Sequence, residues 1–310
     1  ALKLQRELVA SKPDDDQLLF ELGQTEYWVG FAAWRAGDFE RAATGFGAYR
    51  QVSEKLVARE PGNREWRAEV AFALTNLGAL ASERKHYADA LPLFRQSMVV
   101  VDTLLQESGL ATAVAADLLN ARSWEGTTLM ALGRRDEGLA VLGDHAARIR
   151  ALIAQAPDDH RLQESFCNGL SSYGVAAIEA GQPQLALSIA VEGARIARSL
   201  IARDADNLDY QVDRAYHLQV EASARFQLGE WAVARASIDA AIAALMAVLD
   251  RDPARILARI SLMSLWDLGF DQAWRDGDLP QTRRIVADAL RVADSTPVGS
   301  LHAPLIRASA

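Results

Sequence analysis

The sequence predicts an all-α solenoid of antiparallel helix pairs, with about 12 long helices and a leading half-repeat. Three observations predict this fold. Glycines recur every 48 residues, prolines recur on a second 48-residue spacing between them, and small or large apolar residues stand at fixed offsets from each glycine. A spacing kept without insertion or deletion indicates one supersecondary unit repeated along the chain.

The first spacing marks a turn. Steps of 48 residues from Gly37 meet glycine at five of six positions, and a lysine takes the remaining one. The six turn residues are Gly37, Lys85, Gly133, Gly181, Gly229 and Gly277. Glycine readily takes the left-handed conformation that ends a helix. We therefore expect the first helix of every pair to end here.

The second spacing marks the other turn. It carries Pro13, Pro61, Pro157 and Pro253, with Gly109 and Ala205 in the two remaining positions. Two residues after four of these positions come Asp15, Asn63, Asp159 and Asn207, which suit the N-cap of the next helix. Each helix should then have about 20 residues and be roughly 30 Å long.

These two spacings set the expected organisation. Residues 1–13 match the end of a second helix, so we expect them to finish a preceding, truncated repeat. The six hairpins are expected at residues 14–61, 62–109, 110–157, 158–205, 206–253 and 254–296. Residues 297–310 leave the pattern and are interpreted as an irregular C-terminal tail.

Fixed offsets from the turn residue predict how the helices meet. Seven residues before it stand Gly30, Gly78, Gly126, Gly174 and Ala222, and nine after it stand Phe46, Phe94, Leu142, Ala190 and Ile238. The small residues should allow the two helices of a pair to approach closely, and the large ones should fill the space between pairs.

The bulk composition excludes several classes. The chain has 310 residues, a net charge of −8 and one cysteine. An acidic chain is a poor candidate for binding nucleic acid, and one cysteine excludes an internal disulfide framework. No uninterrupted apolar run approaches the ~20 residues that span a bilayer.

Candidate catalytic features do not fit the repeat. Gly169–Gly174 reads GLSSYG, but Gly174 occupies the small-residue position of a helix rather than a nucleophile elbow. The histidines show no metal-ligand spacing, and Cys167 lies beside a core position, as a packed thiol would. We expect no enzyme, metal or cofactor in this fragment.

The segments GFAAWRAGDFERAATGF and GALASERKHYADALPLF resemble the tetratricopeptide repeat in their spacing of small, turn, aromatic and apolar residues. The resemblance covers residues 14 to about 295, but that repeat usually has ~34 residues, so both helices are extended here. It implies a right-handed superhelix whose concave groove, lined by the first helices, takes a peptide, a protein segment or a small ligand.

The first helices carry the candidate binding residues. At matching positions they show uncharged polar and aromatic side chains, with an acidic column at one edge that includes Glu69. The candidate groove residues are Tyr27, Trp28, Asn76, Asp117, Asn120, Ser123, Trp124, Asn168, Ser171, Asp213 and Tyr216. The carboxylate clamp of the resembled family uses lysines that this chain lacks, so a basic or neutral protein or peptide partner fits better.

Two further groups stand at positions where other repeats are apolar or small. Arg122, Glu125, Arg214, Glu221 and Arg225 are expected to form structural ion pairs, the alternative being a polar pocket in repeats three to five. Trp231, Trp266 and Trp274 stand mainly in packing columns and are expected in the core.

Two functions stay open. Long repeats of this form look like those C-terminal to bacterial Ser/Thr kinases or winged-helix regulators, which implies a sensory binding domain of a larger signalling protein. The array would then be extracytoplasmic if attached to a membrane kinase, and cytoplasmic otherwise. The alternative is a scaffold or self-association domain, a homo-oligomer with no small ligand.

Overall fold

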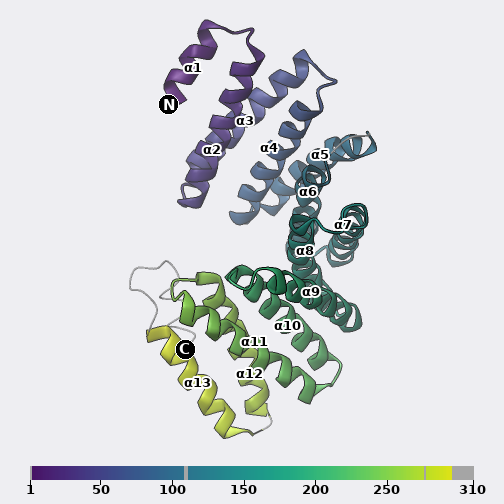
Figure 1. Ribbon diagram of the computed structural model, residues 1–310, viewed down its shortest axis with the longest axis vertical. Helices are drawn as coiled ribbons and strands as arrows, with labels where there is room; N and C mark the ends of the chain where they lie inside the picture. The colour runs from purple at the N-terminus through teal and green to yellow at the C-terminus, as the bar shows by residue number, and fades with distance from the viewer. Residues whose placement is uncertain (1, 108–110, 276, 295–310) are drawn as a thin grey trace. The chain divides into compact units, whose positions relative to one another are not determined.

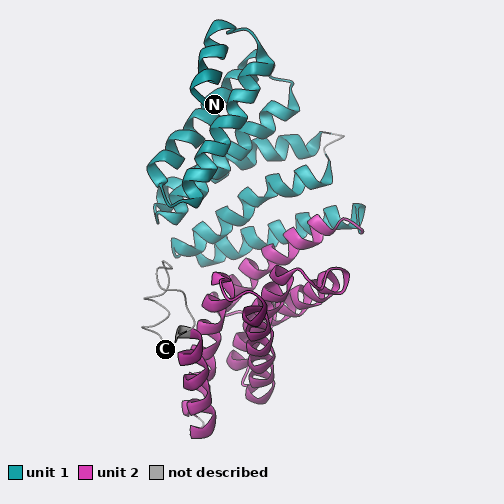
Figure 2. Cartoon of the chain, turned by 60° about the vertical axis from the view of Figure 1, so that its left-hand side comes forward, with its two compact units in different colours: residues 1–157 teal, residues 158–310 magenta. Residues whose placement is uncertain are grey.

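The computed structural model describes residues 2–107, 111–275 and 277–294, and within them it contains thirteen α-helices and no strand (Figure 1). This confirms the all-α class and the alternation of long antiparallel helices. The chain divides into two compact units, Ala1–Pro157 and Asp158–Ala310 (Figure 2). The expected tail, residues 297–310, and Gly109 lie outside the described residues.

Unit 1 holds a half-length helix and three hairpins. Its helices are α1 (Leu2–Ser11), α2 (Asp16–Arg35), α3 (Phe39–Arg59), α4 (Arg64–Glu83), α5 (Tyr87–Gln106), α6 (Thr112–Ala131) and α7 (Arg135–Gln155). Each helix contacts its neighbours in the chain, and the first helices α4 and α6 also contact each other. The first helices α4 and α6 thus lie next to each other.

Unit 2 repeats the arrangement with three hairpins. Its helices are α8 (His160–Glu179), α9 (Pro183–Arg203), α10 (Leu208–Gln227), α11 (Trp231–Arg251), α12 (Ile256–Arg275) and α13 (Leu279–Asp294). The first helices α8, α10 and α12 contact one another in sequence order. Helices α2 to α12 have 20 or 21 residues each, which confirms the predicted helix length.

The turn between the helices of every pair has the predicted left-handed residue. All five predicted glycines have positive φ, between 68° and 79°, and Lys85 takes φ 62° at the sixth position. After Gly37, the Asp38 amide donates to the Ala33 carbonyl at 2.9 Å, and the His86 amide bonds the Ala81 carbonyl in the same way. The turn therefore keeps its geometry without glycine, and Lys85 bears the conformational cost.

The predicted N-caps are also in place. Asp15, Asn63, Asp159 and Asn207 accept hydrogen bonds from the first backbone amides of α2, α4, α8 and α10. These bonds satisfy donors that the helix itself leaves unpaired. The proline spacing and the cap residues thus set where each first helix begins.

Close packing of α2 on α3 depends on two glycines. A Cβ added to Gly30 would lie 2.9 Å from Phe46 Cδ1, and one added to Gly45 would lie 2.6 Å from the Gly30 Cα. Phe46 is fully buried as a result, and so is Phe94 at the same position of the next repeat. The predicted pairing of small with large residues is therefore confirmed for these hairpins.

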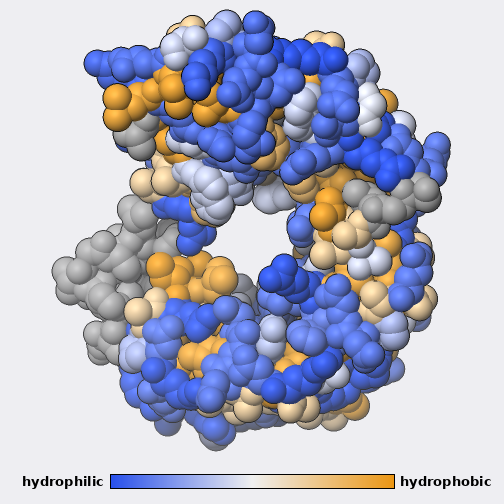
Figure 3. Space-filling model, turned by 45° about the horizontal axis from the view of Figure 1, so that its top comes forward, coloured by the Kyte–Doolittle hydropathy of each residue, from blue (hydrophilic) through white to orange (hydrophobic). Residues whose placement is uncertain are grey.

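Two of the tryptophans expected in the core are on the surface. Trp266 is buried, but the side chains of Trp231 and Trp274 are 48% and 64% exposed. Trp231 lies against Phe226, and Trp274 stacks on Phe270, so each ring packs on one side only. On the face drawn in Figure 3 the surface is mainly hydrophilic, with apolar side chains in separate patches.

Among the helices that the structure describes, one, α11, is long and apolar enough to cross a membrane by length and composition. No uninterrupted apolar run reveals this, because Arg235 and Asp239 interrupt an alanine-rich helix. In unit 2, α11 packs between α10 and α12, and its Ile238, Ala241 and Leu245 are buried in the core of that unit. A core helix of this composition passes the same test.

Candidate ligand-binding pocket

Unit 1 has a pocket of about 420 Å³ among the first helices α2, α4 and α6 and the second helix α3. Its lining combines aromatic rings, amides and carboxylates. The lining residues are Gln24, Tyr27, Trp34, Tyr49, Glu69, Phe72, Thr75, Asn76, Ala79, Asp117, Asn120 and Trp124. These described residues include two acids and no lysine or arginine, so the pocket has negative character.

Glu69 of α4 is held in place by two donors. The Tyr49 hydroxyl donates to Glu69 Oε2, and the Gln24 side-chain amide donates to the same oxygen at 2.7 Å. The other oxygen, Oε1, accepts no hydrogen bond from any residue that the structure describes. Burial raises the pKa of Glu69 above its ordinary value, although both hydrogen bonds act to lower it.

The backbone brings Tyr49 to this place from the second helix. Tyr49 is twelve residues after the turn residue Gly37, and its side chain is only 3% exposed. Its ring lies 5.5 Å from that of Tyr27, and burial together with the charge of Glu69 raises the pKa of its hydroxyl. The hydroxyl is therefore a fixed donor in a low-dielectric setting.

The aromatic walls are fixed by contacts behind them. Trp124 stacks on Phe94 with ring centroids 6.1 Å apart and planes 9° apart. Trp34 meets Phe46 edge to face, and its indole N–H donates to Glu83 Oε2 at 2.5 Å. Rings held in this way offer a ligand contact area at little cost in side-chain entropy.

Polar groups supply directional contacts. The Asn76 amide donates its N–H to the Phe72 carbonyl at 2.8 Å, which fixes the orientation of the side chain. Asp117 and Asn120 are exposed and lie three residues apart on one face of α6. The pocket thus offers amide and carboxylate acceptors beside aromatic surface.

The structure brings together five of the eleven residues predicted for the groove. Tyr27, Asn76, Asp117, Asn120 and Trp124 all line the pocket.

Two others in unit 1 do not line it. Trp28 is 60% exposed and lines a separate hollow along α2 with Val29 and Ala32, and Ser123 is half-buried beside Trp124.

The remaining four predicted residues belong to unit 2. Asn168 is exposed, and Ser171, Asp213 and Tyr216 are half-buried. Burial, together with the charges of the neighbouring acids Asp209 and Glu164, raises the pKa of Asp213 to about 6. Burial also raises the pKa of the Tyr216 hydroxyl. Asp213 therefore holds a proton more readily than an ordinary aspartate does.

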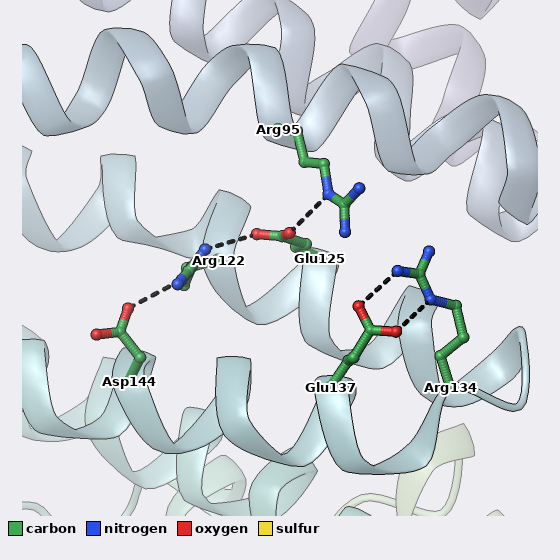
Figure 4. A network of polar contacts seen from close by, with 6 residues as sticks. All are labelled: Arg95, Arg122, Glu125, Arg134, Glu137 and Asp144. Carbon is green, nitrogen blue, oxygen red and sulfur yellow. Dashed lines mark hydrogen bonds and ion pairs between the residues drawn. The ribbon is translucent and has the colours of Figure 1, made fainter.

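The expected ion pairs are present in unit 1. Glu125, 4% exposed, binds Arg95 of α5 at 3.1 Å and Arg122 of its own helix at 2.9 Å. Arg122 also binds Asp144 of α7 at 2.9 Å, so three consecutive helices are joined (Figure 4). Because each buried charge has a partner, we interpret the network as ion pairs that hold the three helices together.

The corresponding charges of unit 2 are also paired, with one exception. Arg225 binds Glu221 at 2.8 Å and also binds Glu230. The Nε of Arg214 is buried without a hydrogen-bond partner among the described residues.

Cys167 forms a buried cluster in unit 2. Its thiol lies 3.3 Å from His217 Nε2, and the Ser171 hydroxyl lies 3.4 Å from the same nitrogen. Cys167 and His217 are both fully buried, so no substrate reaches them. Burial raises the pKa of the thiol and lowers that of His217 to about 4, so both groups are neutral. The arrangement of a nucleophile and a base is therefore a packing contact.

No cluster of three or more metal-ligating side chains occurs within the described part of the chain. In the pocket, Glu69 accepts hydrogen bonds from a phenol and an amide. The pocket presents acceptors, one desolvated carboxylate and fixed rings.

No protein-family model matches the chain, and no curated protein matches its sequence. In structure it is similar to BtubC from P. vanneervenii, with a TM-score of 0.59 and 13% identity over 83% of this chain and 91% of that one.

Two other solved structures show the same similarity of fold. The S. pombe nuclear import adaptor Nro1 has a TM-score of 0.58 and 11% identity over 95% of this chain and 100% of its own. A kinesin light chain-like protein of Podosopora anserina with nearly identical TPR-like repeats has a TM-score of 0.53 and 14% identity, covering 75% and 96%.

Proposed function

We propose, from the tetratricopeptide-repeat fold that the chain adopts, that it is a binding module which takes a peptide or protein segment on its first helices. The pocket around Glu69 carries this proposal. It is concave, has fixed aromatic walls, and combines them with a few oriented polar groups. Sites that recognise peptides and small ligands have this composition.

The proposal also states the kind of larger protein to which the module belongs. The resemblance of its long repeats to those of bacterial signalling proteins supports a role as the sensory part of such a protein, a receptor Ser/Thr kinase being the specific candidate. A ligand on the first helices would favour one packing of neighbouring hairpins over another, and so pass a signal along the array. The sequence of the full gene product tests this part, because a regulator of another class would contradict it.

Selection from a displayed library of random twelve-residue peptides tests the binding function. We expect enriched peptides to bind the native chain and to lose at least tenfold in affinity on Asn120→Arg. Asn120 is exposed and lines the pocket, so an arginine there blocks it without disturbing the core.

The matched control is Gln51→Arg, which adds the same charge at an exposed position of α3 that does not line the pocket. Selected peptides should bind this variant as they bind the native chain. Failure to enrich any peptide, or equal binding to the native chain and to Asn120→Arg, would overturn the proposed function.

Self-association is the second candidate, and exposed apolar side chains in unit 2 favour it. Leu257 and Trp274 of α12 are 62% and 64% exposed, and Leu290 of α13 is 47% exposed. Light scattering over a hundredfold range of concentration tests this candidate. A mass that rises with concentration in the native chain and not in Leu257→Glu would support it, and a constant monomer mass would exclude it.

A further inference from the structure

We infer that the unit 1 pocket binds the guanidinium group of an arginine in the bound peptide, with Glu69 as its charge partner. This inference rests on the proposed peptide-binding function and names the chemistry of its ligand. It is carried by the hydrogen bonds of Glu69, by the charges around the pocket and by the arrangement of the aromatic rings.

The hydrogen bonds orient Glu69 and leave half of its carboxylate for a ligand. Both of its donors, Tyr49 and Gln24, meet Oε2. Oε1 is an acceptor on a fixed group that lines the pocket, and no described residue bonds to it. A desolvated carboxylate with one unused oxygen is set to accept an N–H from outside the chain.

The pocket places negative charge around Glu69. No described lysine or arginine forms an ion pair with Glu69, and a second acid, Asp117, lines the same pocket. Glu65, one turn earlier on α4, adds a further negative charge and raises the pKa of Glu69. Elsewhere in unit 1 the buried Glu125 has two arginine partners, so an acid in this setting normally receives a cation.

The rings favour arginine over a compact ammonium ion. Trp34, Phe72 and Trp124 line the pocket together with Tyr27. A planar guanidinium stacks on aromatic faces while its N–H groups reach acceptors in its own plane, whereas a lysine ammonium does not. Glu69 Oε1 and the Asn76 side-chain oxygen are acceptors of the required kind.

Binding should be coupled to protons. Burial raises the pKa of Glu69, so its charged form is disfavoured in the empty pocket. A bound cation favours that charged form, and binding should release a proton and strengthen as pH rises through the pKa of Glu69. The titratable groups that act on Glu69 or are affected by it are Tyr27, Tyr49 and Glu65, and Asp117 lines the same pocket; the pKa values of both tyrosines are raised.

The test uses a defined probe, N-acetyl-arginine N-methylamide, and its uncharged citrulline counterpart. Both are titrated into the ¹⁵N-labelled chain and followed by NMR. We expect the arginine compound to shift the signals of the pocket residues with a millimolar dissociation constant. The citrulline compound, which has nearly the same shape, should bind at least tenfold more weakly.

Glu69→Gln should abolish the preference for arginine over citrulline. The matched control is Glu65→Gln, which removes the same charge at an exposed position one turn away and should keep most of that preference. Equal binding of the two compounds to the native chain, or a preference unchanged in Glu69→Gln, would overturn the inference. Thermal unfolding of both variants verifies that each is folded.

The two proposals can fail separately. If library peptides bind on the first helices, carry no arginine and bind Glu69→Gln normally, the arginine assignment is wrong and the peptide-binding function stands. If the arginine compound binds at Glu69 but no library peptide is enriched, the guanidinium site stands and the peptide-binding function is wrong.

Discussion

Tyr49 in unit 1 and Gly193 in unit 2 occupy the same position of the repeat, twelve residues after the turn glycines Gly37 and Gly181. In unit 1 the side chain at this position, Tyr49, extends from the second helix α3 to Glu69 on the following first helix α4. In unit 2 the second helix α9 has no side chain at this position. His217 of the following first helix α10 lies where a side chain at residue 193 would be.

The difference teaches how one backbone produces either a site or a core. A tyrosine at this position directs its hydroxyl to a carboxylate that lines a pocket. A glycine admits a histidine that turns inward to Cys167 and is fully buried. At this repeat position Tyr49 thus supports a carboxylate that lines a pocket, whereas Gly193 makes room for an enclosed histidine.

The largest expected effect comes from filling the space beside His217. A Cβ added to Gly193 would lie 2.1 Å from His217 Cε1, so Gly193→Ala forces the buried ring to move. We expect a loss of about 3 kcal/mol in the free energy of unfolding, measured by urea denaturation.

The matched control is Gly47→Ala in α3, where an added Cβ meets nothing within 4 Å. This change should stabilise the chain by about 0.5–1 kcal/mol, because alanine favours the helix. A cost below about 0.5 kcal/mol for Gly193→Ala would show that the ring does not occupy this space.

The second effect is a loss of stability in acid. The pKa of His217 is lowered to about 4 by burial, against an ordinary value of 6.5. Between these values the unfolded chain takes up a proton that the folded chain refuses, so stability is full above pH 6.5 and falls towards pH 4. The loss should reach about 3 kcal/mol.

His217→Gln isolates this contribution from the other titrating groups, including His145 and Asp213. We expect urea denaturation at pH 7 and at pH 4.5 to differ less for His217→Gln than for the native chain. Equal pH dependence of the two proteins would show that His217 is not buried in its neutral form.

Removing the tyrosine hydroxyl should cost less. Tyr49→Phe removes one of the two donors to Glu69, and we expect a loss of about 1.5 kcal/mol at neutral pH. Tyr210→Phe is the comparison in unit 2, where the hydroxyl lies 3.5 Å from Glu164 Oε2 in a more exposed place. That change should cost under about 0.5 kcal/mol, and equal costs would contradict the role given to Tyr49.

The smallest effect concerns the turn that both units share. Lys85 has φ 62° where the other five turn residues are glycine, so Lys85→Gly should stabilise the chain by about 1 kcal/mol. Gly133→Lys should destabilise it by a similar amount, since nothing within 4 Å opposes an added Cβ and only the backbone conformation does. Thermal unfolding of both variants measures this.

The sequence predicts the fold well because turns and caps are local. A glycine at a positive φ, a proline between helices and an aspartate at an N-cap each act within a few residues, so their 48-residue spacing defines the helices. Even the exception follows this logic, because Lys85 keeps the turn that the spacing requires.

The pocket is less predictable because it depends on contacts between repeats. Asn76, Asn120 and Trp124 were found from the first-helix positions, but Tyr49 was missed because it comes from a second helix. The same position holds Ser97, His145, Gly193 and Ala241 in other repeats, so a large polar residue there is shared by Tyr49 and the buried His145. The exposure of Trp231 and Trp274 was not predicted, because a side chain at a packing position of the repeat is buried only where a neighbouring helix packs against it.

A crystal structure of the chain with a library-selected peptide tests the central claim most directly. The account predicts the peptide along α2, α4 and α6, with an arginine guanidinium within hydrogen-bonding distance of Glu69 and between the rings of the pocket. A peptide bound on the outer face of the second helices, or an acidic or apolar side chain placed at Glu69, would contradict it.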